Sequence, residues 1–323
     1  LFVPIVTVAL PAYLARLYPA HSRRTITLTF MTMAVAGVVF PSLLDRLIVA
    51  HPRHLAYFVH APYAIVGVLL VLGALLFLRA PTSGPYTEAT YAKPPSLREG
   101  LRQLGRPTMA LILLLSAIHV LSDATMGSWF PIYAKERFGE ALRHPGDVMA
   151  LCALAYVVSR SILVFVPEGR GRRTLLLLPG LVGGSILLAA IWADSPVALF
   201  WGYPLAAFAW SAQYPALMGE AARRTPRYVS SLLAVSMILA QVSTAAVTYG
   251  VGYFIKTAST TEAMVDALRW IVGAELNVPW WMPDHRWAIT IAPLGFILFG
   301  LMVAITGLGR RKVQTTPAAN AEA

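Results

Sequence analysis

The sequence predicts an all-α polytopic membrane protein built from two related helical bundles, and three observations support this fold class. Of all residues, 57% are hydrophobic and only 13% are charged, whereas soluble domains are roughly half apolar and about a quarter charged. Apolar stretches of the ~20 residues needed to cross a bilayer recur along the whole chain. Two parts of the sequence also match each other, as in transporters assembled from repeated bundles.

The internal repeat rests on matching prolines and basic turns. Pro11 and Pro215 each precede a basic turn and a long apolar run, and they are 204 residues apart. Pro62 and Pro293 each open an apolar run that ends at an arginine, with an offset of 231 residues. A period of this size is far longer than that of a solenoid repeat, so we interpret the repeated unit as a bundle.

The expected membrane spans begin at the first residue. Residues 1–15 form a partial span that starts at Leu1 and lacks the features of a signal peptide. We therefore expect the chain to be a fragment, incomplete at its N-terminus, with one partial and eight full transmembrane helices. The full spans are expected at residues 25–44, 55–78, 108–133, 148–166, 174–193, 197–218, 228–255 and 286–308.

A proline-rich and basic linker, residues 80–107, divides the chain. Within it, residues 96–104 are predicted to form a short amphipathic helix on the membrane surface. Residues 1–79 would be the second half of an N-terminal bundle, with spans equivalent to the fourth to sixth. Residues 108–312 would be a C-terminal six-helix bundle, with spans equivalent to the seventh to twelfth.

Two segments are expected to lie outside the membrane beyond the linker. Residues 256–285 form a second connection in which Trp280 and Trp281 are interpreted as an interfacial anchor. Residues 313–323 are small and polar, and we expect a disordered tail. Glycine clusters inside the spans, at Gly180, Gly183 and Gly184 and at Gly250 and Gly252, predict close helix approach or local bending.

The net charge of +11 is distributed between the two sides of the membrane. Counting Lys and Arg by alternating sides gives 17 on one side and 8 on the other, with Arg160 inside a span. The positive-inside rule makes the richer side cytoplasmic, together with residues 80–107 and the C-terminus. We expect a multi-pass protein of the bacterial inner or plasma membrane type and a monomer, and no binding of nucleic acid.

Sequence signals for enzymes and cofactors are absent. The sequence has no glycine-rich phosphate loop, no His-Glu-x-x-His pair and no Gly-x-Ser-x-Gly elbow. Its single cysteine, Cys152, rules out a disulfide within the chain. These absences favour a protein that is not an enzyme and that holds no cofactor or metal.

The six-plus-six arrangement, the basic central loop and the basic turn at residues 169–173 together resemble the major facilitator superfamily. Residues 211–216 (Ser-Ala-Gln-Tyr-Pro-Ala), which precede a basic loop and Ser230-Ser231, resemble the tenth-to-eleventh span region of its fucose-permease-like sugar symporters. Residues 123–133 (Asp-Ala-Thr-Met-Gly-Ser-Trp-Phe-Pro-Ile-Tyr) resemble the seventh span of that branch.

This resemblance implies a secondary active transporter that moves a small polar solute across the bilayer by alternating access. A sugar or sugar-like compound is the hypothesised substrate, and the proton is the hypothesised coupling ion. The partial span at residues 1–15 has no acidic residue. No residue there can therefore be matched to a proton-coupling carboxylate of the family. An efflux carrier for amphipathic compounds and a transporter-like receptor or assembly factor remain as alternatives.

Charged residues inside the spans are the first candidates for a site, because a central Asp or Arg costs roughly 2.5–3.5 kcal/mol even on translocon-based scales. Asp123 is the acidic residue well inside a span, and it shares one helical face with Ser116 and His119. His119 and Asp123 form a hypothetical proton-coupling pair joined by a hydrogen bond. The alternative is that Asp123 braces a bend before Gly127 and Pro131.

Arg160 is the second candidate and completes this charge group. It is predicted either to pair with Asp123 across the bundle or to bind a substrate oxygen or carboxylate. The alternative is that its side chain extends to the cytoplasmic face.

Aromatic and amide side chains form the third candidate group. Sugars present apolar C–H faces and hydroxyl groups, so their sites combine aromatic rings with bidentate amides. Ordinary helix packing is the alternative for each residue, and the two glutamines are favoured because a buried amide needs partners. The substrate-binding candidates are Trp129, Trp210, Gln213, Tyr214, Gln241 and Thr244.

Overall fold

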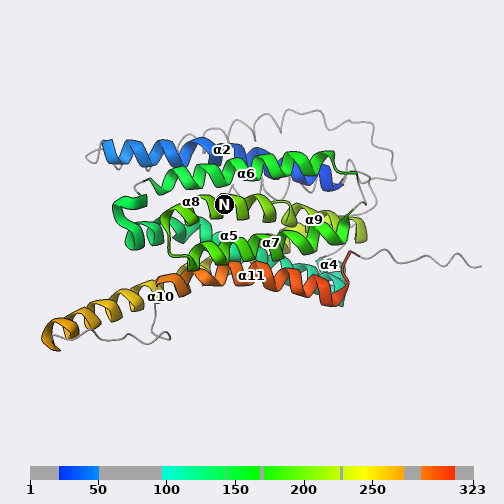
Figure 1. Ribbon diagram of the computed structural model, residues 1–323. Coiled ribbons are helices and arrows are strands. Elements are labelled where there is room, and N and C mark those ends of the chain that lie inside the picture. The colour runs from blue at the N-terminus through cyan, green and yellow to red at the C-terminus, as the bar shows by residue number, and fades with distance from the viewer. Residues whose placement is uncertain are drawn as a thin grey trace, which may run out of the picture.

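The computed structural model describes residues 22–50, 97–142, 144–167, 171–225, 228–272 and 285–309, and their regular secondary structure is helical (Figure 1). A short 3-10 turn, η4, covers Gly139–Leu142. The α-helices are α2 (Ser22–Ala50), α4 (Leu97–Leu104), α5 (Pro107–Phe138), α6 (Pro145–Phe165), α7 (Arg172–Trp192), α8 (Pro196–Trp210), α9 (Gln213–Arg224), α10 (Val229–Val272) and α11 (His285–Thr306).

Five helical stretches within the described part of the chain are long and apolar enough to cross a membrane. They lie in α5, α6, α7, α10 and α11, and each coincides with a span predicted from the sequence. The predicted spans at 1–15 and 55–78 and the tail at 313–323 lie outside the described residues. The short helix predicted at residues 96–104 is confirmed as α4.

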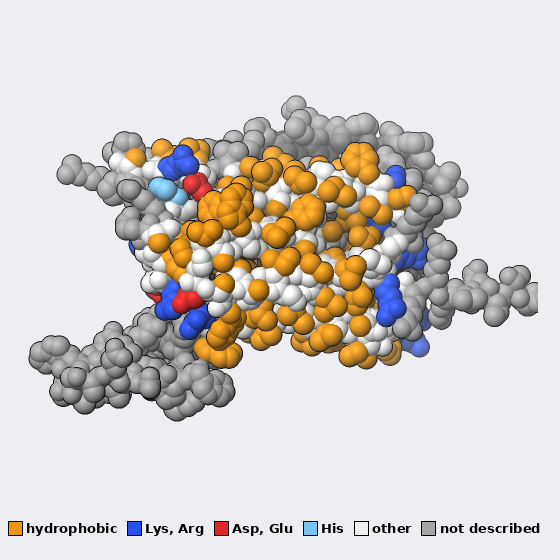
Figure 2. Space-filling view, in the orientation of Figure 1, with side chains coloured by type: hydrophobic (Ala, Val, Ile, Leu, Met, Phe, Trp, Pro, Cys, Tyr) orange, Lys and Arg blue, Asp and Glu red, His pale blue; other side chains and the backbone are white. Residues whose placement is uncertain are grey.

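The long helices run side by side, and apolar side chains cover the middle of the bundle (Figures 1 and 2). Helix α2 contacts α6, α7 lies against both α8 and α11, and α5 contacts α10 and α11. Basic side chains gather toward the ends of the helices in Figure 2. This distribution is the one that a lipid-facing surface requires, with apolar groups at the hydrocarbon and charges at the headgroups.

Small residues allow α7 and α11 to approach closely. A Cβ atom at Gly180 would lie 2.5 Å from the Phe296 carbonyl oxygen, and one at Gly184 would lie 2.8 Å from that of Pro293. The sequence prediction of close approach is therefore confirmed at these two glycines. At Gly250, by contrast, no described atom lies within 4 Å of the position that a Cβ would occupy.

The break between α8 and α9 follows from Pro215. A proline has no N–H for the carbonyl four residues earlier, and its ring clashes with that carbonyl. The carbonyl in question belongs to Ser211, and α8 ends at Trp210 while α9 begins at Gln213. Arg160 donates its Nε–H to the Ser211 carbonyl over 3.2 Å. An arginine from α6 thus replaces the donor that the proline lacks.

The span expected at residues 228–255 coincides with the apolar stretch Ser231–Tyr253, and α10 continues beyond it as a helix to Val272. Figure 1 shows this helix extending past the ends of its neighbours. Residues 256–272 contain no glycine or proline that would interrupt a helix. The part of the predicted connection that the structure describes is accordingly helical.

Candidate functional site

A hydrogen-bonded cluster joins three helices in the interior, and Asp123 of α5 is its acceptor. The Tyr156 hydroxyl of α6 donates to the Asp123 carboxylate. The indole N–H of Trp210, at the end of α8, lies 2.7 Å from the Tyr156 oxygen and 3.3 Å from Asp123 Oδ1. Trp210 is fully buried and its ring stacks on Phe296 of α11 at 4.1 Å.

Arg160 lies one helical turn from Tyr156 and is 8% exposed. Its guanidinium carbon is 4.8 Å from the centre of the Tyr156 ring. Nε donates to the Ser211 carbonyl, and Nη1 donates to the Phe30 carbonyl of α2 over 2.6 Å. Arg160 forms no ion pair with the residues that the structure describes, so Tyr156 separates it from Asp123 and the hypothesised direct pair is not formed.

His119 is held by an amide rather than by Asp123. Its Nδ1 lies 3.2 Å from Gln213 Oε1, and Gln213 Nε2 donates to the Leu176 carbonyl over 2.8 Å. Its ring stacks on Tyr214 at a centroid distance of 5.5 Å. The hypothesised hydrogen bond from His119 to Asp123 is absent here, because the carboxylate is occupied by Tyr156 and Trp210 while the imidazole faces Gln213.

Hydroxyl groups extend this polar interior to α10. Ser116 Oγ lies 2.6 Å from Ser236 Oγ, and the Tyr214 hydroxyl lies 3.0 Å from the same atom. Ser116 and Ser236 are fully buried. The sequence-predicted residues Asp123, Arg160, His119, Trp210, Gln213 and Tyr214 thus lie in one region where α5, α6, α8 and α9 meet.

Three predicted substrate-binding residues lie apart from these contacts. Trp129 packs against Gly252 of α10, and its buried indole nitrogen has no hydrogen-bond partner among the described residues. The Thr244 hydroxyl donates to the Ala240 carbonyl of its own helix over 2.9 Å. Gln241 is exposed, so the expectation that its amide is buried is wrong.

Tyr156 is the residue that sequence reasoning did not assign. Its hydroxyl and its ring face connect the two opposite charges of the interior, Asp123 and Arg160. The available signal was the spacing of four residues between Tyr156 and Arg160, which places both on one face of α6.

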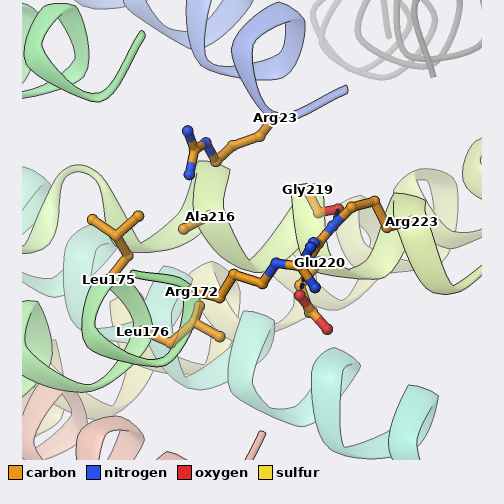
Figure 3. Close-up of a pocket in the computed structure, with 8 residues that line it drawn as sticks. All are labelled: Arg23, Arg172, Leu175, Leu176, Ala216, Gly219, Glu220 and Arg223. Carbon is orange, nitrogen blue, oxygen red and sulfur yellow. Dashed lines mark hydrogen bonds and ion pairs between the residues drawn. The ribbon is translucent and has the colours of Figure 1, made fainter. Parts of the chain in front are cut away.

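Hydrogen bonds and an ion pair connect α2 to α6 and the residue after it at three positions along their length. Near one end, Arg23 donates to the Val166 carbonyl. In the middle, Phe30 accepts from Arg160. At the other end, Asp147 accepts from Ser42 and pairs with Arg46 at 3.2 Å. The end that carries Arg23 is called the basic end below, because Arg172 and Arg223 lie there too (Figure 3).

A small pocket, partly open to the outside, lies at the basic end (Figure 3). Glu220 of α9 is 4% exposed within it and pairs with Arg223 and, at 2.6 Å, with Arg224. The pocket does not include Asp123, Tyr156 or Trp210. Its lining residues are Arg23, Arg172, Leu175, Leu176, Ala216, Gly219, Glu220 and Arg223. Within the described part of the chain, no three His, Cys, Asp or Glu residues are grouped to hold a metal ion.

The described helices and their apolar surface indicate a multi-pass integral membrane protein. The family model of the Major Facilitator Superfamily matches residues 1–248. The chain therefore belongs to this family, and family and fold together point to a transporter rather than an enzyme.

The chain is similar to solved structures of other transporters. The chain is similar to the E. coli fucose:proton symporter FucP, with a TM-score of 0.60 and 16% identity over 96% of this chain and 72% of that one. FucP in the outward conformation gives the same values. A bacterial homologue of the human lysosomal transporter Spinster has a TM-score of 0.46 and 15% identity, over 89% and 68% of the two chains. A search of curated proteins found no match.

Proposed function

We propose that this protein is a secondary active transporter that moves a small polar solute, of the sugar or sugar-like class, by alternating access. The observation that carries the proposal is the cluster of Asp123, Tyr156 and Trp210 inside a bundle of apolar helices. Polar groups at this depth are costly and mark substrate or ion pathways. The solved FucP structure, a fucose:proton symporter, supports the same substrate class at the level of the fold.

The cluster supplies the chemistry that a polyhydroxylated solute needs. Trp210, whose ring is stacked on Phe296, offers its indole N–H as a donor, and the Tyr156 hydroxyl can both donate and accept hydrogen bonds. We assign Trp210 to substrate binding on this ground. Gln213 and Tyr214 instead orient His119 and Ser236. Trp129, Gln241 and Thr244 remain proposals that this cluster does not support.

Asp123 is the proposed proton carrier. In its ionised form the carboxylate accepts the Tyr156 O–H and the Trp210 N–H. A proton on Asp123 removes the negative charge that attracts both donors, so they become available to substrate hydroxyl groups. Proton binding and substrate binding would then favour each other, as symport requires.

The test is transport by Asp123→Asn in proteoliposomes, with the full chain reconstituted. Asparagine keeps the size of the side chain and cannot bind the proton. We expect loss of accumulation driven by a pH gradient, with exchange of substrate between the two sides retained. Asp194→Asn, at an aspartate outside the spans, is the control and should accumulate substrate normally. Normal accumulation by Asp123→Asn would exclude the coupling role.

We also propose that the basic end faces the cytoplasm. The excess of Lys and Arg on this side supports the assignment. Under it, residues 80–107 and the C-terminus are cytoplasmic, residues 1–79 belong to one bundle, and residues 108–312 form the second. Accessibility of single introduced cysteines to an impermeant maleimide, in a Cys152→Ser background, distinguishes the two orientations.

A further inference from the structure

Arg160 is a buried cation that forms no direct ion pair with the described residues. It is 8% exposed, and the acceptors of its two hydrogen bonds are the neutral carbonyl groups of Ser211 and Phe30. A buried charge is costly unless an opposite charge balances it. The nearest acidic cluster member, Asp123, lies on the far side of the Tyr156 hydroxyl.

The two hydrogen bonds fix the guanidinium and leave part of it unused. Nε is taken by the Ser211 carbonyl that Pro215 leaves without a donor, and Nη1 is held by Phe30 of α2. Nη2 donates to no residue in the described ranges. A planar guanidinium with unused N–H groups matches the two oxygens of a carboxylate better than it matches a single hydroxyl.

Charge balance gives an independent reason for an anionic substrate. With Asp123 ionised, its charge and that of Arg160 cancel across Tyr156. When Asp123 binds a proton, the positive charge of Arg160 is left alone in a medium of low dielectric constant. A neutral sugar cannot restore the balance, whereas a substrate with one negative charge restores it.

We propose that the transported solute is a monovalent sugar acid or similar hydroxy acid, and that Arg160 binds its carboxylate. This inference rests on the proposed transport function and narrows its substrate class. The hydroxyl groups of the solute meet the Tyr156 hydroxyl and the indole N–H of Trp210, and its carboxylate meets the unused N–H groups of Arg160. One proton and one such anion cross together, so the transport step moves no net charge.

The first experiment measures uptake by the reconstituted full chain of three acids and of their neutral counterparts. The pairs are galacturonate and galactose, glucuronate and glucose, and gluconate and glucitol. We expect at least one acid to be taken up along a pH gradient, at least tenfold more efficiently than its neutral partner. A membrane potential set by potassium and valinomycin should leave its rate unchanged.

Each other result has a defined meaning. Uptake of a neutral sugar in preference to its acid overturns the carboxylate inference and leaves the proposed function standing. Acid uptake that responds to membrane potential overturns the charge balance and with it the inference. Absence of saturable uptake for all six solutes contradicts both the inference and the proposed transport of sugar-like solutes.

The second experiment compares Arg160→Gln and Arg160→Lys. Glutamine can still donate to the Ser211 carbonyl but has no charge. We therefore expect the ratio of uptake efficiencies, acid over neutral partner, to fall about 10–100-fold and to approach one. Lysine keeps the positive charge but lacks the planar guanidinium with its paired N–H groups. It should therefore retain part of the preference for the acid. If both variants lose the acid and the neutral solute equally, Arg160 only supports the helix break. Arg137→Gln is the control and should keep the preference.

Discussion

Trp210 donates its indole N–H to the Tyr156 oxygen over 2.7 Å, and this contact ties the end of α8 to the middle of α6. Asp123 of α5 accepts from both residues, so three helices meet at one hydrogen-bonded point. The stacking of Trp210 on Phe296 adds α11. A shift of any of these helices must change the hydrogen bonds of the proposed proton carrier.

Replacing Tyr156 by phenylalanine tests the hydroxyl alone. The variant keeps the ring beneath Arg160 and removes the O–H that reaches Asp123. Hydrogen bonds to charged groups contribute roughly 1.5–3 kcal/mol, so we expect kcat/KM for transport to fall about 10–100-fold. Tyr203→Phe is the matched control, because Tyr203 is buried beside Trp210 but forms none of these hydrogen bonds. Equal losses in the two variants would contradict the role of the Tyr156 hydroxyl.

Adding one methyl group at Gly180 should destabilise the bundle. The new Cβ would lie 2.5 Å from the Phe296 carbonyl and 2.7 Å from Gln213 Nε2, so α7 and α11 must separate. We expect Gly180→Ala to lose about 1–3 kcal/mol of stability, measured by thermal unfolding in detergent.

The matched control for this substitution is Gly250→Ala, at a helical position with open space around the Cβ. It should leave the melting temperature unchanged or raise it, because alanine favours the helix by up to about 1 kcal/mol. If both variants melt alike, the close contact of α7 and α11 at Gly180 is not limiting for stability.

The stability of the folded protein should decrease at acidic pH, because Asp194 loses its interaction with Arg137 when it is protonated. It lies between α7 and α8 and accepts from Arg137 Nε at 3.0 Å and Nη2 at 2.6 Å, with Arg286 at 3.8 Å. The hydrogen bond from Arg137 holds the pKa of the Asp194 carboxyl below its usual value of 3.8. The interaction therefore stabilises the folded protein fully above that value and is lost as the pH falls through the lower, folded-state pKa.

The measurement is the difference in unfolding free energy between the wild type and Asp194→Asn at pH 7 and at pH 3. Because the side chain is 34% exposed, we expect no more than about 1 kcal/mol at pH 7 and a smaller difference at pH 3. Asparagine suits this site, because Asp194 has a φ of 49° and asparagine tolerates that region. If the difference in unfolding free energy grows as the pH falls, the stabilising role of ionised Asp194 is contradicted.

Much of the fold is predictable because apolar runs bounded by basic turns mark α5, α7 and α11 directly. The break at Pro215 is not predictable in this way, since other prolines inside the described helices leave those helices continuous. Whether a proline breaks a helix depends on the neighbours that satisfy the freed carbonyl, and these are set by packing. The continuous examples are Pro41, Pro131, Pro179, Pro204 and Pro293.

The candidate site shows the same division. Asp123, Arg160 and Gln213 are recognisable from the sequence, because charges and amides are rare within apolar runs. Their partners are not recognisable, since a single sequence does not fix how neighbouring helices are rotated. That rotation turns His119 toward Gln213 and brings Tyr156 between the two charges.

The three contacts between α2 and α6 make the two directions of opening chemically unequal. At the basic end, Arg23 bonds to a backbone carbonyl and is 5% exposed. At the other end, the side chains of Arg46 and Asp147 are 65% and 29% exposed. Dissolved ions screen exposed pairs strongly and buried ones weakly. In a carrier whose bundles separate at one end at a time, ionic strength will therefore accelerate opening at the Asp147 end and leave the basic end nearly unaffected.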